Sequence, residues 1–117
     1  MAKTWAFSTH IDLQGCNSII IKDKKSVAIF AKGLCAAIKM KPHKKAMIER
    51  FGKGHLKGLS MFQFIETSSL SAHFDEQKSR AFIDIFSCKR YDARKAASFC
   101  KNFFKARKEK HFSITRR

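Results

Sequence analysis

Side chains that can carry out nucleophilic or acid–base chemistry are concentrated in one short stretch of the 117-residue chain. The stretch contains hydroxyl, imidazole and carboxylate groups: Ser60, Glu66, Thr67, Ser68, Ser69, Ser71, His73 and Asp75. A serine hydroxyl is a weak nucleophile until a neighbouring group takes its proton. His73 is the one side chain here that titrates near neutral pH, so it is the candidate for that proton transfer.

Each candidate also has an ordinary structural explanation. Serine and threonine are common in strands and turns, and a single histidine is more often a hydrogen-bonded structural residue than a catalyst. Cys88 alone resembles the small buried residue that free cysteine usually is. Phe51 is one of 12 phenylalanines and could pack in the core. Residue types by themselves therefore leave the structural and catalytic interpretations open.

The hydrophobic pattern predicts the elements that must position these groups. Alternation of apolar and polar residues predicts a strand over 5–13. Ser26 is the expected N-cap of a first helix that must end before Pro42, and Asp92 is the expected cap of a second helix over 93–104. Further strands are expected over 46–51, 59–66, 69–74, 80–87 and 111–115, with a glycine-containing loop over 52–58.

The order of these elements indicates an α+β fold. We expect a two-layer sandwich in which a mainly antiparallel sheet carries both helices on one face. A chain of this length buries only about two thirds of its unfolded surface, which leaves no room for a second core. We therefore expect a single domain over residues 1–117.

The charge balance bears on the partners that the chain could bind. Lys and Arg number 25 against 9 Asp and Glu, a formal net charge of +16 that would attract nucleic acids, anionic lipids or acidic metabolites. The lysines are scattered along the chain, and no helix-turn-helix, zinc-finger or RNP-type motif accompanies them. Nucleic acid is therefore a candidate partner that the sequence does not favour.

The cysteines and the apolar segments bear on the cellular compartment. Cys16, Cys35, Cys88 and Cys100 show neither a Cys-x-x-Cys pair nor the spacing of zinc ligands, so we expect no metal and a reducing cytoplasm. The N-terminus lacks the apolar region of a signal peptide, and no stretch approaches 18 apolar residues. A cytoplasmic protein without a membrane partner is the expectation.

The spacing of the reactive residues matches a known pattern. It comprises Gly58-Leu59-Ser60, Thr67-Ser68, Leu70-Ser71-Ala72-His73 and Ile83-Asp84-Ile85-Phe86-Ser87-Cys88. This arrangement resembles the prokaryotic S-adenosylmethionine decarboxylase proenzyme family. In that family a Gly-hydrophobic-Ser strand leads to a Glu-Ser-His cleavage site, a Leu-Ser/Thr-x-His segment and an acidic-aromatic-Cys strand. The pattern fits residues 60–88 without a gap and extends more weakly to His10, Cys16 and Arg50-Phe51.

The chain departs from the family pattern at two places. The glutamate that directly precedes the cleavage serine in the family is Thr67 here, with Glu66 one position earlier, and the histidine that follows is Ser69. The family's His-Thr-Trp-Pro-Glu segment reads His73-Phe74-Asp75-Glu76-Gln77, so Gln77 replaces its final glutamate. Both changes concern substrate contacts more than the cleavage chemistry.

The resemblance implies a cofactor made from the chain itself. Ser68 would attack the Thr67 carbonyl, the chain would split between these residues, and Ser68 would become a pyruvoyl group. His73 and Ser60 would support the proton transfers of this reaction. A pyruvoyl group accepts electrons from a substrate amine bound to it as a Schiff base, as other decarboxylase cofactors do.

The resemblance also implies the substrate and its contacts. Cys88 would return a proton to the substrate carbon after decarboxylation, as a thiol with a pKa near neutral can. Phe51 would stack on the adenine of S-adenosylmethionine, and Glu66 and Thr67 would also contact the substrate. The product would be the aminopropyl donor for polyamine synthesis, and the family builds its sites at the interface of a homodimer.

Two other functions remain open at this point. The changes at Thr67 and Gln77 leave room for the same pyruvoyl chemistry on a free basic amino acid such as ornithine or arginine. Alternatively, the chain could be a homologue that no longer cleaves and binds nucleic acid or a partner enzyme through its basic surface.

Overall fold

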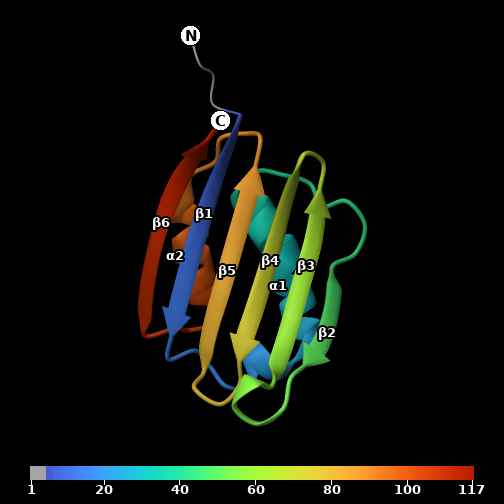
Figure 1. Cartoon of the computed structure of the whole chain (residues 1–117), viewed down its shortest axis with the longest axis vertical. Helices are drawn as coiled ribbons and strands as arrows, with labels where there is room; N and C mark the ends of the chain where they lie inside the picture. Colours follow the sequence, from blue (N-terminus) through green and yellow to red (C-terminus); the bar gives the residue numbers. More distant parts are fainter. Residues whose placement is uncertain (1–4) are drawn as a thin grey trace.

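The computed structural model describes residues 5–117. It contains a six-stranded sheet in the order β2-β3-β4-β5-β1-β6, in which every neighbouring pair is antiparallel (Figure 1). The strands are β1 (Ala6–Gln14), β2 (Met47–Phe51), β3 (Gly58–Ile65), β4 (Ser68–Asp75), β5 (Arg80–Ser87) and β6 (Lys108–Arg116).

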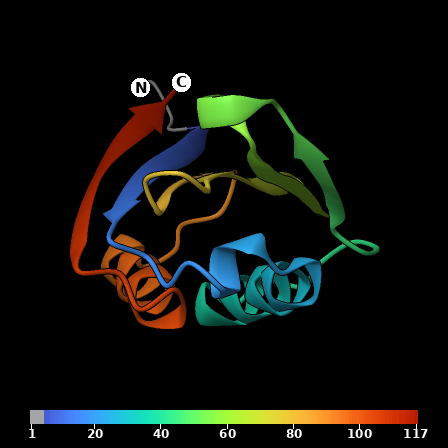
Figure 2. The same cartoon turned by 90° about the horizontal axis from the view of Figure 1, so that it is seen from below.

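Two α-helices, α1 (Lys24–Ala37) and α2 (Ala93–Phe103), cover one side of the sheet, and η1 (Ile20–Lys22) and η2 (Gly54–Leu56) are short 3-10 helices. Figure 2 shows both α-helices on the same side. The expected α+β sandwich with two helices on one face is thus confirmed. Between residues 5 and 117, no helix is long and apolar enough to cross a membrane.

The helix starts reflect local capping chemistry. Asp92 caps α2 as expected, because its carboxylate accepts hydrogen bonds from the amides of Arg94 and Lys95 at 3.0 and 3.2 Å. The prediction that Ser26 caps α1 is wrong. Asp23 is the cap, and it accepts from both the amide and the hydroxyl of Ser26. Aspartate and serine both favour the N-cap position, and the sequence pattern placed the start of α1 one turn too late.

The core lies between the sheet and the helices. Phe30 of α1 contacts Phe104 with ring centroids 4.6 Å apart, and Phe104 contacts Phe74 of β4 at 5.1 Å. All three side chains are buried. The core thereby fixes which side of β4 faces the helices, and because side chains alternate along a strand, it also fixes which residues face away.

The other side of the sheet, which we call the open face, is not covered by any helix or strand of residues 5–117 (Figure 2). Its side chains include His10, Ser60, Phe62, Phe64, Ser71, His73, Phe82, Asp84, Phe86 and Phe112. Phe64, Phe82 and Phe112 are 53, 38 and 54% exposed. Large aromatic side chains gathered on one uncovered face are a common mark of an interaction surface.

Candidate active site

The first group of candidate residues lies where the turn between β3 and β4 meets the end of β5. We call this region the cleavage corner and define it by Met40, Thr67, Ser68, Ser87 and Cys88. Ser68 is the first residue of β4 and pairs in register with Ser87 of β5. Its side chain is on the helix side and the residue is only 8% exposed.

The Ser68 hydroxyl donates a hydrogen bond to Ser87 Oγ at 2.7 Å. Ser87 Oγ also accepts from the amide of Lys89 at 2.9 Å and donates to the sulfur of Met40 at 3.7 Å. Because its proton points to Ser87, the Ser68 oxygen keeps its lone pairs free on the side away from Ser87. Sequence reasoning gave Ser87 no role, although it was part of the quoted pattern, because the β4–β5 register was not known.

The peptide bond between Thr67 and Ser68 has two unusual features. Thr67 has φ 61°, in the left-handed region that a β-branched residue rarely adopts and that costs roughly 1–2 kcal/mol. The Thr67 carbonyl accepts a hydrogen bond from the amide of Cys88 at 3.3 Å. A backbone donor at this oxygen can stabilise the negative charge that forms there when a nucleophile attacks.

Cys88 differs from the other three cysteines in its exposure. Cys16, Cys35 and Cys100 are buried, whereas Cys88 is half-buried. Burial raises the pKa of Cys16 and of Cys35 to about 11 and raises that of Cys100 as well. Of the four cysteines, Cys88 is therefore the one most accessible to a bound molecule.

The second group of candidate residues lies on the open face. Ser60 of β3 and His73 of β4 are register partners, and Ser60 Oγ lies 3.0 Å from His73 Nδ1. Gly58 secures this register, since a Cβ at Gly58 would lie 1.7 Å from the carbonyl oxygen of Phe74. The glycine of the Gly-x-Ser pattern is thus needed for the close approach of β3 to β4.

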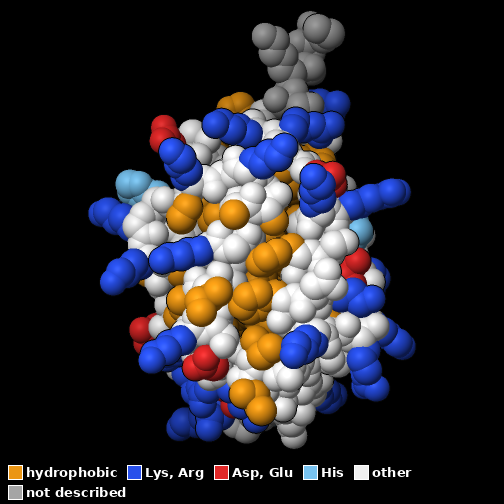
Figure 3. Space-filling view, turned by 180° about the vertical axis from the view of Figure 1, so that it is seen from behind, with side chains coloured by type: hydrophobic (Ala, Val, Ile, Leu, Met, Phe, Trp, Pro, Cys, Tyr) orange, Lys and Arg blue, Asp and Glu red, His pale blue; other side chains and the backbone are white. Residues whose placement is uncertain are grey.

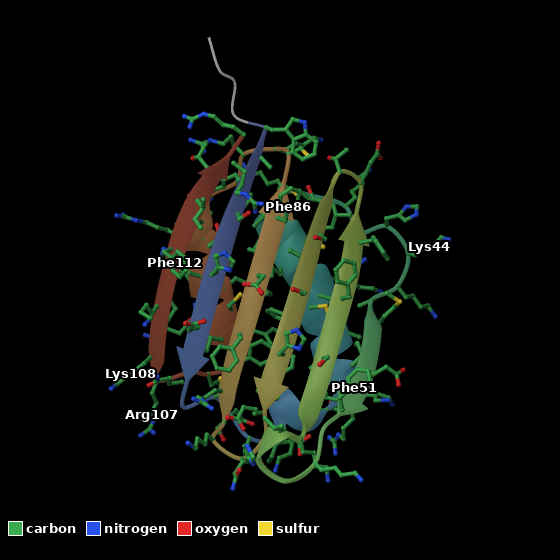
Figure 4. The ribbon with its side chains drawn as sticks, viewed as in Figure 1. Lys44, Phe51, Phe86, Arg107, Lys108 and Phe112 are labelled. Carbon is green, nitrogen blue, oxygen red and sulfur yellow. The ribbon has the colours of Figure 1, made fainter. Side chains whose placement is uncertain are left out.

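Phe51 belongs to this second group. It pairs with Gly58, so it is on the same face as Ser60, and it is 60% exposed. Figure 4 shows Phe51 at one end of the sheet and Phe86, the register partner of Ser69, near the other end. Phe51 therefore lies at the end of the sheet remote from the cleavage corner.

The two groups are not brought together within one chain. Ser68 and His73 are five positions apart on β4, so their side chains point to opposite sides of the sheet. Their α-carbons are separated by roughly 17 Å at the usual rise of an extended strand. His73 of the same chain is thus not within reach of the Ser68 hydroxyl.

The residues at the altered end of the family pattern are held by ion pairs. Arg50 Nη2 lies 3.0 Å from Glu76 Oε2 and donates to the Lys22 carbonyl at 3.0 Å. The Asp75 carboxylate accepts from Arg80 Nε and from the amides of Gln77 and Lys78. Each carboxylate thus lies beside an arginine of the same chain, and within residues 5–117 Oε2 of Glu76 accepts no hydrogen bond.

Glu66 and Thr67 form the exposed turn between β3 and β4, and the Thr67 hydroxyl donates to the Glu66 carbonyl at 2.6 Å. Both residues line a cavity of about 410 Å³ beside the cleavage corner. Among residues 5–117, no group of three or more His, Cys, Asp or Glu side chains could hold a metal ion.

Comparisons with known proteins agree with this fold and with the sequence pattern. The solved structure of adenosylmethionine decarboxylase from Aquifex aeolicus VF5 has a TM-score of 0.81 to this chain at 16% identity, covering 98% of this chain and 92% of that one. No curated protein sequence matches the chain. At such low identity the structural match establishes the fold.

The sequence match establishes the family. The model of the S-adenosylmethionine decarboxylase family matches residues 8–117, and the chain belongs to that family. The family assignment expected from residues 60–88 is confirmed, and the chain is an enzyme of the decarboxylase class acting on S-adenosylmethionine. Members of this family depend in general on a pyruvoyl group.

Proposed function

We propose that this chain cleaves itself between Thr67 and Ser68 and then decarboxylates S-adenosylmethionine with the pyruvoyl group derived from Ser68. The observation that supports this most directly is the geometry of the cleavage corner. A buried serine directly follows a strained Thr67, whose carbonyl accepts a hydrogen bond from the Cys88 amide at 3.3 Å.

The cleavage chemistry needs only groups of this chain and water. Ser68 Oγ attacks the Thr67 carbonyl carbon, the peptide C–N bond breaks, and the freed nitrogen takes up a proton, which leaves an ester. Loss of the Ser68 Cα proton then breaks the ester C–O bond and releases Thr67 as a carboxylate. Water adds to the dehydroalanine that remains, ammonia leaves, and residue 68 becomes the pyruvoyl group.

The buried position at the start of β4 fits this group, since Ser87 and the Cys88 amide are polar neighbours of the Thr67–Ser68 bond. When present, the pyruvoyl group supplies the electron sink for decarboxylation. Cys88 donates the proton to the substrate carbon, and its half-buried position allows contact with a bound molecule. Phe51, which is remote from the cleavage corner of its own chain, stacks on the adenine from the second chain of a homodimer, while Glu66 and Thr67 contact the substrate near the cleavage corner.

We further propose that two copies of the chain form a homodimer through the open face. Phe51, Ser60 and His73 lie on that face, remote from Ser68 of the same chain. A second copy packed against the open face in the antiparallel sense would carry its own Ser60–His73 pair toward the cleavage corner of the first. The exposed aromatic residues of this face, among them Phe64 and Phe112, are suited to such packing.

The test is the mass of the purified protein. We expect two fragments, residues 1–67 and 68–117, with the second beginning in a pyruvoyl group. Ser68→Ala should give only the full-length mass. Persistence of the wild-type full-length mass after long incubation at neutral pH would exclude self-cleavage. The processed protein should release carbon dioxide from S-adenosylmethionine but not from ornithine or arginine, which have no adenine for Phe51 to stack on.

A further inference from the structure

The cavity beside the cleavage corner is basic. It has a volume of about 410 Å³, and three lysines, Lys39, Lys41 and Lys89, line it together with Glu66 and Thr67. A neighbouring cavity of about 310 Å³ shares Lys39 and Lys89 and adds further cations, Arg90 and Lys95, against the single carboxylate of Asp92. Figure 3, a view from behind Figure 1, shows many Lys and Arg side chains around the edge of that face.

These lysines are not neutralised in the uncleaved chain. Among residues 5–117, the ion pairs of Lys and Arg side chains involve Arg50 and Arg80 and none of the three lysines. Glu66 is the one carboxylate that lines the larger cavity, so the cavity holds three positive charges and one negative charge. Like charges gathered around one small space repel one another and favour binding of an anion.

Self-cleavage would create an anion at this place. Elimination of the ester leaves the N-terminal fragment ending in the carboxylate of Thr67, a residue that already lines the cavity. The new chain end is no longer bound to residue 68, so Thr67 can leave its left-handed conformation. The cavity would then hold three positive and two negative charges, in place of three positive and one negative.

We propose that Lys39, Lys41 and Lys89 form the binding site for the carboxylate that cleavage creates at Thr67. The inference rests on the proposed self-cleavage. The ligand is the chain's own new C-terminus, and its binding holds the N-terminal fragment beside the cofactor and favours the cleaved state over the intact one. The lysines are exposed, so the interaction weakens as salt increases.

The first experiment does not need cleavage. In a Ser68→Ala background, Thr67→Asp places a carboxylate in the cavity, and Thr67→Asn is its neutral match, since Asp and Asn both tolerate a left-handed backbone. We expect the Asp variant to melt roughly 1–4 °C above the Asn variant at low salt. Adding Lys39→Gln, Lys41→Gln and Lys89→Gln should remove that difference, whereas the same change at Lys32, Lys45 and Lys53, which are exposed and line neither cavity, should not.

The second experiment keeps Ser68 and measures the association of the fragments. After processing, the triple variant at Lys39, Lys41 and Lys89 should release the 1–67 fragment at lower urea concentration than the triple control, with the gap closing at high salt. Equal melting of the Asp and Asn variants, or a difference that survives loss of the three lysines, would overturn the binding site. Failure of the wild-type chain to cleave would instead overturn the proposed function, and the first experiment would still decide on the site.

Discussion

The cleavage corner and the Ser60–His73 group differ in how they are held. At the cleavage corner, the reacting groups are fixed by hydrogen bonds to neighbouring strands, and Ser68 is 8% exposed. The Ser60–His73 pair is instead exposed on the open face, where Ser60 and His73 contact each other across two strands. The corner contains the candidate nucleophile Ser68, and the open face contains the imidazole that the corner lacks.

Under the proposed function, one chain therefore holds two incomplete halves of a site. A nucleophile needs a base within about 3 Å, and a backbone donor cannot supply one. Within one chain the histidine lies on the wrong side of the sheet. A second copy on the open face would bring a Ser60–His73 pair to the end of the sheet where Ser68 lies, although on the face opposite the Ser68 side chain. The experiments that test whether the two halves act together run from the largest expected effect to the smallest.

The largest effect is expected from separating the two halves onto different chains. Ser68→Ala should abolish cleavage, and His73→Ala should slow it by roughly 10²-fold or more because proton transfer is lost. When the two variants are co-expressed, the His73→Ala chain retains its serine and would receive His73 from its partner. We expect mass spectrometry to show a 68–117 fragment with the lower mass that the His73→Ala substitution gives. If that fragment forms no faster than from His73→Ala alone, the two halves do not act across chains.

Replacing Cys88 should distinguish formation of the pyruvoyl group from its use in decarboxylation. Cys88→Ala keeps the backbone amide that contacts the Thr67 carbonyl, so it should retain some processing. Loss of the thiol should lower turnover by roughly 10²-fold or more, with the proton then added at the wrong carbon and the pyruvoyl group converted to alanine. The measurement is the mass of the 68–117 fragment before and after substrate. Wild-type turnover with an unchanged fragment would remove Cys88 from the mechanism.

The open face should control association. Phe112→Lys puts a charge on a half-exposed aromatic position and should weaken the dimer by roughly 10–100-fold, the effect of losing one buried aromatic side chain. Ile29→Lys on α1 is the matched control, because Ile29 is 62% exposed on the opposite side of the sheet. Sedimentation equilibrium at moderate salt measures both. Equal dissociation constants for the two variants would place the interface elsewhere.

The strands and helices could be predicted from the sequence because the residue patterns that specify them are local. Alternating patterns fixed the strands, and Asp92 and Pro42 bounded the helices. β6 starts at Lys108, earlier than the predicted 111, because charged residues at the exposed start of an edge strand give no alternating pattern. Strand order and register were beyond the sequence, since they depend on pairings between distant residues.

The sequence predicted which residues belong to the candidate site but not how they are arranged in space. Spacing and resemblance selected Ser60, Ser68, His73 and Cys88, but a pattern of spacing does not state which face a side chain occupies. The odd separation of Ser68 and His73 on one strand predicts opposite faces, and this consequence appears once both are known to lie in β4. The roles of Ser87 and of the Cys88 amide required the register with β5.

The smallest effect concerns the turn that ends β4 near the Ser60–His73 group. Burial raises the pKa of the Asp75 carboxyl, but hydrogen bonds from Arg80 and from the amides of Lys78 and Gln77 outweigh it and hold that pKa below its usual range. A carboxyl with a lowered pKa in the folded state stabilises the fold above its unfolded pKa, about 3.9, and loses this contribution as the pH falls through the folded value. Asp75→Asn should therefore lower the free energy of unfolding by about 1 kcal/mol at pH 7 and by progressively less below about pH 4. Asp92→Asn is the control, because asparagine caps a helix as well as aspartate does. Urea unfolding of both variants from pH 2.5 to pH 7 measures their free energies of unfolding. If the loss of stability in Asp75→Asn does not change with pH, the charge of the Asp75 carboxylate does not stabilise the turn.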